Sequence, residues 1–307
     1  MIDLSHFDSL VSLVTYFDSE EKCRQTLAEQ RWGEPPVCPH CGSHRVSARK
    51  DGRYLCNHCR KTFSVISGTV FESTKMPLRK WFLAMYLIAA HKKGISSVQL
   101  SSDLGITQKT AWHILHKVRH LMGQDDGRLF GEVEMDEMYY GGKESNKHES
   151  KKVKGTQGRS TKTKTPVFGM VQRKGNLKAV AVPGTKSETL LGIVKEYVTK
   201  GCKVYTDELS AYKRLTDEGY GHDFVRHHEK EYVSGSVFTN TIEGFWSQMS
   251  RMLYGTHHAV SRKHLQRYVD EEVFRWNSCE RSTGWLFSWM FDRCSGRFTY
   301  KDVTLAA

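Results

Sequence analysis

The sequence has no run of apolar residues long enough to cross a bilayer. Its first residues, Met1-Ile2-Asp3-Leu4-Ser5, lack the basic region and the apolar segment of a signal peptide. No internal repeat is present. The lack of a long apolar run argues against an integral membrane protein, and the lack of a signal peptide argues against an exported one. We therefore expect the protein in the cytoplasm.

Acidic residues are in short supply. The chain has 34 Asp and Glu against 46 Lys and Arg, which gives a formal net charge of +12. Residues 1–30 hold two basic and six acidic residues, so the other 277 residues carry +16. Such a basic surface favours nucleic acid as a partner, and a merely soluble basic protein is the alternative. With 307 residues and 38% hydrophobic content, the chain can form one catalytic domain and one or two small modules.

The eight cysteines fall into two groups. Four are scattered: Cys23, Cys202, Cys279 and Cys294. The other four form two CxxC knuckles with fourteen residues between them: Cys38, Cys41, Cys56 and Cys59. Each knuckle can point two thiolates at one ion, so we interpret the pairs as zinc ligands in a reducing compartment rather than as disulfides. Four thiolates leave no open position, and the zinc is therefore expected to be structural.

The residues between the knuckles suit a short hairpin that carries four basic side chains: Arg45, Arg49, Lys50 and Arg53. These side chains either contact phosphate or form a solvated face. His40 and His58 lie inside the knuckles, where we expect them beside the ligands or at the surface rather than bound to the ion.

Hydrophobic spacing predicts the secondary structure of the rest of the chain. Apolar residues predict a helix over 3–17, and Asp18 with Glu21 predicts the cap of a second one. Residues 77–122 are helical with two interruptions. After Gly127, strands are predicted near 131–139, 167–173, 177–183, 203–206 and 223–227, and helices near 186–199, 240–253 and 262–277. This order favours an α/β catalytic domain.

A helix-turn-helix module is predicted within the helical region. Residues 96–104 form its first helix, 105–107 its turn with Thr107 as N-cap, and 108–122 its second helix. An inward apolar stripe leaves a polar and basic face for the major groove, whose candidate DNA contacts are Gln108, Lys109, Thr110, His113 and Lys117. Many packed helical hairpins look similar, so plain packing is the alternative.

We therefore expect five segments: an N-terminal helical segment (1–36), a zinc ribbon (37–74), a helix-turn-helix module (75–126), a catalytic domain (127–280) and a C-terminal tail (281–307). Within the catalytic domain, residues 141–165 contain eight Lys or Arg, only two acidic residues and almost nothing apolar. This composition predicts a mobile basic loop, which is either a DNA-contacting arm or a solvated linker.

Three acidic residues are candidates for phosphoryl-transfer chemistry. Asp136 lies in an alternating strand, Asp207 follows the short strand 203–206, and Glu243 begins a predicted helix. Two magnesium ions held by such carboxylates can activate an attacking oxygen and stabilise a leaving one. Spacing alone is weak support, because 34 acidic residues form many triples and each acid taken singly can be an ordinary surface residue.

Four stretches carry a family resemblance. They are Cys38-Pro39-His40-Cys41-Gly42 with Cys56, Cys59, Phe63 and Gly68-Thr69; Glu134-Met135-Asp136-Glu137 with Gly141-Gly142; Tyr205-Thr206-Asp207 with Tyr212; and Asn240 to Ser247, continuing through Tyr254-Gly255, His258, Ser261, Lys263-His264-Leu265, Tyr268 and Phe274-Arg275-Trp276-Asn277. In these the chain resembles the DDE-type transposases of bacterial insertion sequences, in the ISXO-like group with an N-terminal zinc ribbon. The likeness covers roughly residues 15–278.

The resemblance implies an RNase H-like catalytic fold, a mixed sheet with flanking helices, and a Mg²⁺- or Mn²⁺-dependent reaction that cuts and joins DNA. It also implies double-stranded DNA and further copies of the chain as partners, in the bacterial nucleoid. Asp136 and Asp207 match the first two catalytic acids of the family. Either Glu243 or Asn240 provides the third ligand, and a carboxylate holds a divalent cation better than an amide.

One position departs from the family pattern. Relatives have Lys-Arg after the Phe-Trp-Ser block, whereas Ser250-Arg251 stands here, so Arg251 is expected to supply the basic role alone. Two alternatives to an active transposase remain open: a catalytically inactive, domesticated DNA-binding regulator, and a structure-specific nuclease on the same fold.

Overall fold

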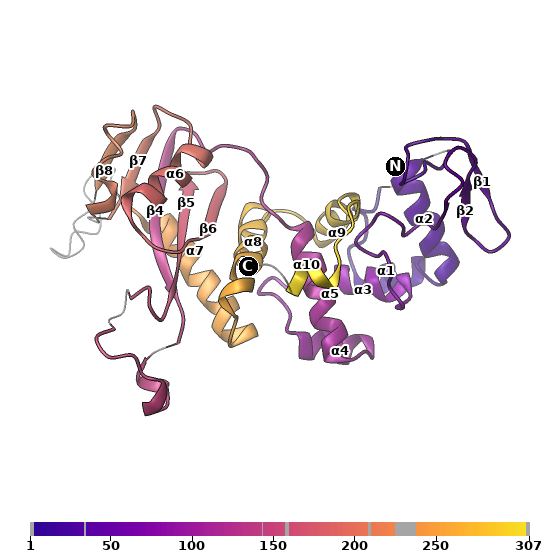
Figure 1. The fold of residues 1–307 in the computed structure, drawn as a ribbon, viewed down its shortest axis with the longest axis horizontal. Coiled ribbons are helices and arrows are strands. Elements are labelled where there is room, and N and C mark those ends of the chain that lie inside the picture. The colour runs from indigo at the N-terminus through magenta and orange to yellow at the C-terminus, as the bar shows by residue number, and fades with distance from the viewer. Residues whose placement is uncertain are drawn as a thin grey trace. The chain divides into compact units, whose positions relative to one another are not determined.

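The computed structural model of the chain describes residues 3–33, 35–142, 144–156, 160–207, 210–224 and 238–304. Its contacts divide the chain into two units, one of residues 1–122 with 280–307 and one of residues 123–279. Figure 1 shows the helices and strands of both. None of the helices in the described ranges is long and apolar enough to span a membrane.

The first unit combines helices with a small antiparallel sheet of order β1-β2-β3. The strands are β1 (Val46–Ala48), β2 (Tyr54–Cys56) and β3 (Thr62–Phe63). The helices are α1 (Leu10–Tyr16), α2 (Glu20–Trp32), α3 (Leu78–Ala90), α4 (Ser97–Leu104), α5 (Gln108–Leu121), α9 (Thr283–Asp292) and α10 (Tyr300–Thr304).

The N-terminal helices differ from the prediction in their start positions. The helix predicted over 3–17 begins only at Leu10, because the side chain of Ser9 caps it by accepting from the Ser12 N–H. The predicted cap at Asp18 is wrong by one residue. Ser19 has the extended backbone of an N-cap, and its hydroxyl accepts from the Lys22 N–H at 3.3 Å.

The C-terminal residues belong to the core of the first unit, although the sequence pattern set 281–307 apart as a tail. Helix α9 packs on α3 through aromatic rings, with Phe291 4.9 Å from Phe82 between centroids. At Gly284 a Cβ would lie 2.2 Å from the carbonyl oxygen of Ser5, so only glycine lets α9 approach the N-terminal backbone this closely. Residues 305–307 of the predicted tail lie outside the described residues.

The second unit is built on a five-stranded mixed sheet of order β6-β5-β4-β7-β8. The strands are β4 (Glu132–Tyr140), β5 (Thr165–Gln172), β6 (Leu177–Ala181), β7 (Lys203–Thr206) and β8 (Gly221–Phe224). β5 is antiparallel to both β4 and β6, whereas β4, β7 and β8 run parallel. Of the last predicted strand, 223–227, residues 225–227 lie outside the described residues.

Helices cover both faces of this sheet, with α6 (Ser187–Tyr197) on one and α7 (Asn240–Ser250) and α8 (Arg262–Asn277) on the other (Figure 1). Alternation along β4 sorts its side chains between the faces. Val133 and Met135 pack in the core under α6, whereas Glu134 and Asp136 bond to α7. A π-helical segment, η5 (Arg251–His257), follows α7 directly. The predicted mixed α/β architecture is confirmed.

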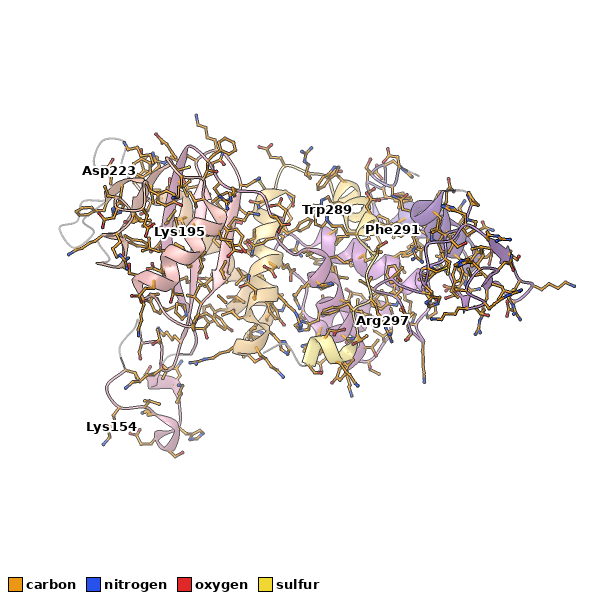
Figure 2. All side chains as sticks on the ribbon, turned by 45° about the horizontal axis from the view of Figure 1, so that its top comes forward. Lys154, Lys195, Asp223, Trp289, Phe291 and Arg297 are labelled. Atoms are coloured by element: carbon orange, nitrogen blue, oxygen red, sulfur yellow. The ribbon has the colours of Figure 1, made fainter. Side chains whose placement is uncertain are left out.

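The segment between β4 and β5 extends away from the sheet, and Figure 2 marks Lys154 within it. It contains two short 3-10 helices, η1 (Glu144–Asn146) and η2 (Glu149–Lys151), and most of its described side chains are exposed. Lys152 pairs with Glu149 at 2.6 Å. Residues 143 and 157–159 of the predicted basic loop lie outside the described residues.

Candidate functional site

The four predicted zinc ligands converge. The Sγ atoms of Cys38, Cys41, Cys56 and Cys59 all lie within 4.8 Å of one another. The Sγ atoms of Cys38 and Cys59 are 3.7 Å apart and those of Cys41 and Cys56 3.6 Å, which fits thiolates placed about 2.3 Å from a shared tetrahedral zinc ion. These side chains therefore fit a structural zinc ion, as the sequence predicted.

Backbone turns in the knuckles orient these thiolates. Gly42 and Arg60 adopt positive φ angles of 70° and 59°, and their N–H groups donate to the carbonyls of Cys38 and Cys56. The N–H of Cys59 also donates to the Cys56 sulfur at 3.4 Å and lowers the pKa of that thiol, which favours the thiolate that zinc binds. His40 and His58 are exposed and outside the ligand cluster.

The end of α2 packs against the ribbon. The Trp32 ring meets Tyr54 and Phe63 edge-on, at centroid distances of 5.3 and 6.0 Å. Arg31 donates to the carbonyls of Val65 and Ser67, the latter at 3.0 Å. The ribbon thus gains an aromatic core from a helix that the sequence analysis assigned to a separate segment.

In the second unit, the pairing of β4 with β7 brings Asp136 and Asp207 to neighbouring positions. The two strands are parallel, and Glu134 is the partner of Tyr205 in their register. Asp136 lies two residues after Glu134, and Asp207 lies two residues after Tyr205, so both acids follow the last paired residues of the two strands. Asp136 is half-buried, and Asp207 is 8% exposed.

Helix α7 carries the third acid. Glu243 and Asn240 are three residues apart, and both side chains are exposed on the helix. The opposite face of α7 is buried through Ile242, Phe245 and Met249, which pack over β5 and β6. Burial of this apolar face fixes the helix against the sheet and orients its polar face.

The electrostatics of Asp136 link the three acids. Burial, together with the charges of Asp207 and Glu243, raises the pKa of Asp136 from 3.8 to about 6, and two N–H donors oppose this rise. The two donors are the Glu137 backbone N–H and the Trp246 indole. Within the described part of the chain, only the four cysteines form a group of three or more metal-ligating side chains whose ligand atoms all lie within 4.8 Å of one another. The carboxylates of Asp136, Asp207 and Glu243 are therefore farther apart than these thiols.

Sequence reasoning gave no role to Trp246, which lies beside this cluster. Its indole Nε1 donates to Oδ2 of Asp136 at 3.0 Å, from α7 to β4. Gly169 is the cross-strand partner of Asp136 on β5. A Cβ at Gly169 would lie 2.7 Å from the Trp246 ring and 2.9 Å from Ile242, so the ring occupies the space that a side chain would fill.

Tyr212 is a second residue whose contact the sequence did not predict. Its side chain is 1% exposed, and its hydroxyl donates to Oε1 of Glu137. Burial holds the pKa of Tyr212 well above its usual value, and the negative charges of Glu137, Asp136 and Asp207 act in the same direction. Tyr212 therefore stays a protonated donor next to the acids.

The predicted helix pair is present as α4 and α5, joined by Gly105 in the left-handed conformation with φ 57°. Thr107 caps α5 as predicted, accepting from the Thr110 N–H at 3.2 Å. Gln108 and Lys109 are exposed, and Thr110 is half-buried.

Two candidate DNA contacts on α5 are not free at the surface. Lys117 was predicted on the polar face, but it is only 4% exposed, because its ammonium donates to the Val70 carbonyl and lies 5.7 Å from the centre of the Trp81 ring. This burial argues against the predicted contact between Lys117 and DNA. His113 is half-buried against the ring of Tyr300 in α10, and burial lowers its pKa.

Arg251 is exposed at the junction of α7 and η5. Its charge acts on Glu272, a carboxyl of α8 that is 3% exposed. Burial, with the charge of Glu271, raises the pKa of Glu272 to about 7 against the lowering effect of Arg275 and Arg251.

Two family profiles match the chain. The ISXO2-like transposase domain matches residues 128–277, and the transposase zinc-ribbon domain matches residues 18–62. The second match includes α2, in agreement with the packing of Trp32 on the ribbon.

Two curated proteins are similar to the chain. One is an uncharacterised protein in the transposable element ISH50 of Halobacterium salinarum, 32% identical over 84% of this chain and 93% of the relative. The other is an uncharacterised transposase-like protein of Haemophilus influenzae, 30% identical over 35% of this chain and 85% of the relative.

Among solved structures, a chain of the simian T-cell lymphotropic virus intasome in complex with the PP2A regulatory subunit B56 gamma is similar at 11% identity. The match covers 61% of this chain and 66% of that chain with a TM-score of 0.29, which is too low to support an argument about fold.

Proposed function

Because the chain belongs to the family of ISXO2-like transposases, we propose that it cleaves the DNA ends of an insertion sequence and joins them to target DNA at Asp136, Asp207 and Glu243. The observation that carries this proposal is geometric: parallel pairing of β4 with β7 brings Asp136 and Asp207 to neighbouring positions, and the Trp246 bond ties Asp136 to the helix that carries Glu243. The three carboxylates come from different elements and repel one another. A divalent cation would relieve this repulsion.

We further propose that the second unit is RNase H-like. The order β6-β5-β4-β7-β8, with β5 antiparallel to its neighbours and a helix layer on each face, supports this assignment. The proposed acids belong to the central strand β4, to the residue that directly follows its neighbour β7, and to the covering helix α7.

Mg²⁺ or Mn²⁺ fits these side chains, because both ions bind carboxylate oxygens. Three carboxylates would leave coordination positions for water and for a phosphate oxygen. Asp136, Asp207 and Glu243 would hold it, and it would activate the attacking oxygen and stabilise the leaving one. Trp246 orients Asp136 through its indole N–H. Asn240, exposed one turn before Glu243, is the alternative third ligand or orients the attacking water.

In the proposed reaction, the oxygen of water or of a DNA 3′ hydroxyl attacks phosphorus in line. A new P–O bond forms while the bond to the leaving oxygen breaks, and no covalent bond to the protein is needed. The pKa of Asp136 is raised to about 6, so its carboxyl is mostly ionised at pH 7 and can bind a cation beside the phosphate.

DNA recognition is assigned to the first unit and to basic segments. The N-terminal turn of α5, with Gln108, Lys109 and Thr110, is the part of a helix-turn-helix that reads base edges. Its two leading side chains are exposed, which supports this role. We also propose that Arg251 and the exposed lysines of residues 144–156 contact phosphates.

The proposed partners are double-stranded element ends, target DNA and further copies of the chain, as membership of the transposase family implies. A second candidate function is a catalytically inactive DNA-binding regulator. The departure at Ser250 from the family pattern favours it, whereas the presence of all three acids favours the enzyme.

A strand-transfer assay tests the proposal. The donor is DNA that flanks the gene, and wild type is compared with Asp207→Asn, in magnesium and in manganese. Joined products from wild type alone support the enzyme and the place of Asp207 in its site. Tight binding of the donor by both proteins without cleavage in either metal favours the regulator.

A further inference from the structure

Glu134 is a buried charge to which the proposed chemistry assigns no task. It lies on β4 two residues before Asp136, and its side chain is 0% exposed. A carboxylate without solvent is stable only when hydrogen bonds and an opposite charge replace the water that it loses. The partners of Glu134 therefore indicate what it does.

Three of its four hydrogen bonds come from the first turn of α7. Oε2 accepts from the backbone N–H groups of Thr241 and Ile242 at 2.9 and 3.2 Å, and Oε1 accepts from the Thr241 hydroxyl at 2.9 Å. The cap residue of α7, Thr239, makes no side-chain capping bond. Glu134 thus supplies from the sheet the cap that a helix start requires, and its negative charge suits the positive end of the helix.

Arg173, just after β5, provides the opposite charge. Its Nε donates to Glu134 at 3.0 Å, and its two terminal nitrogens donate to Glu132 at 2.9 Å and to the carbonyl of Phe238 at 3.0 Å. The guanidinium lies 3.9 Å from the centre of the Tyr205 ring and 3.7 Å from that of Phe238. The same arginine therefore holds Glu134 and the residues that lead into α7.

We propose that Glu134 is a positioning residue that locks the start of α7 to β4, and thereby holds Glu243 and Trp246 over Asp136. This inference rests on the proposed function, because the position of α7 matters to the reaction only if Glu243 acts with Asp136. Glu134 touches no reacting atom in this account. It acts through the two N–H groups and the hydroxyl that it binds.

Glu134→Gln tests this role in the full chain without DNA. The amide cannot accept at both of its terminal atoms, so at least one donor of α7 loses its acceptor. We expect hydrogen exchange of the peptide over residues 239–246 to become about tenfold faster, the size of effect that follows loss of a helix cap. We also expect a lower Mn²⁺ affinity in calorimetry, because the third ligand is no longer held.

Glu132→Gln is the matched control. Glu132 also pairs with Arg173, but it is 48% exposed and receives no bond from α7. Wild-type exchange of the 239–246 peptide and wild-type Mn²⁺ affinity in Glu132→Gln, with both changed in Glu134→Gln, support the proposal. Equal effects of the two substitutions, or wild-type exchange in Glu134→Gln, overturn it, because the ion pair rather than the cap would then matter.

Glu134→Gln leaves Arg173 poorly compensated and can prevent folding. Thr241→Val is then the test, because it removes only the hydroxyl bond; exchange about threefold faster supports the proposal, and wild-type exchange overturns it. Cleavage by wild type decides the proposed function separately. If wild type does not cleave, the exchange data still decide whether Glu134 caps α7.

Discussion

The indole nitrogen of Trp246 on α7 donates a 3.0 Å hydrogen bond to the Asp136 carboxylate on β4. This bond joins the helix that carries Glu243 to the strand that carries the first acid. It favours the ionised form of Asp136 and opposes the burial and the charges of Asp207 and Glu243 that raise its pKa. The balance among these effects makes the site sensitive to pH, to Trp246 and to the space that Gly169 leaves.

The binding of divalent metal is expected to depend on pH. The pKa of Asp136 is raised from 3.8 to about 6, so this carboxyl is protonated below that pH and competes poorly for a cation. Mn²⁺ affinity of the DNA-free protein, measured by calorimetry between pH 5 and 8, should rise through a midpoint near 6. A pH-independent affinity over this range would contradict the assignment of Asp136 as a ligand.

The raised pKa of Asp136 also makes the stability of the fold depend on pH, in the opposite direction from a salt-bridged acid, whose pKa is lowered. Since the folded state binds the Asp136 proton more tightly than the unfolded state, this group favours folding most at low pH. Its contribution falls as pH rises from 3.8 to about 6 and then stays constant. Bound metal should reverse this loss, because it stabilises the ionised form.

Trp246→Phe should move the midpoint of metal binding upward. Phenylalanine fills most of the space of the indole but cannot donate, and a hydrogen bond to a charged group is worth enough to change a pKa by about one unit. The same calorimetric titration measures the shift. Trp276→Phe is the control, because Trp276 packs edge-on against Phe245 of α7. Equal midpoints in wild type and Trp246→Phe would mean that the indole does not act on Asp136.

Gly169→Ala should destabilise the second unit and impair cleavage. The added Cβ would meet the Trp246 ring at 2.7 Å and Ile242 at 2.9 Å, so α7 has to move away from the sheet. Overpacking of this kind costs about 1–3 kcal/mol, which urea unfolding can measure. In Gly192→Ala on α6, where a Cβ meets nothing within 4 Å, stability should stay equal or rise. Similar stabilities of the two variants would argue against close packing at Gly169.

Lys109 and Lys117 should behave differently in DNA binding. Lys109 is exposed on the first turn of α5, so Lys109→Ala should weaken binding and reduce the slope of log affinity against log salt by about one. Lys117→Met should lower stability but leave this salt slope unchanged, because the ammonium is already buried against Val70 and Trp81. A reduced slope in Lys117→Met would show that this ammonium reaches phosphate in solution.

Local sequence patterns predicted the cluster of four cysteines and the cap of α5 at Thr107. The family likeness singles out Asp136, Asp207 and Glu243 among 34 acidic residues, and their catalytic role stays a prediction. These features depend on residues close together in the chain, or on the motifs that carry the family likeness.

The remaining features depend on packing between distant segments. Lys117 lies on the polar side of an isolated helix, and only the approach of residues 70 and 81 buries it. Glu134 is indistinguishable from its acidic neighbours until α7 places two N–H groups over it. The aromatic residues of 281–307 pack against residues far away in the sequence, such as Phe82 of α3, so the local pattern does not predict their burial.

The central claim is that Asp136, Asp207 and Glu243 hold one divalent-metal site that cuts DNA, and Asp207→Cys tests it most directly. A thiolate binds Mg²⁺ poorly and Mn²⁺ better, so cleavage of labelled element ends should be lost in magnesium and partly restored in manganese. Asp217 is exposed in the stretch between β7 and β8, so Asp217→Cys is the control and should cleave in both metals. Undiminished cleavage by Asp207→Cys in magnesium would contradict the account, as would equal loss in both metals by a folded protein.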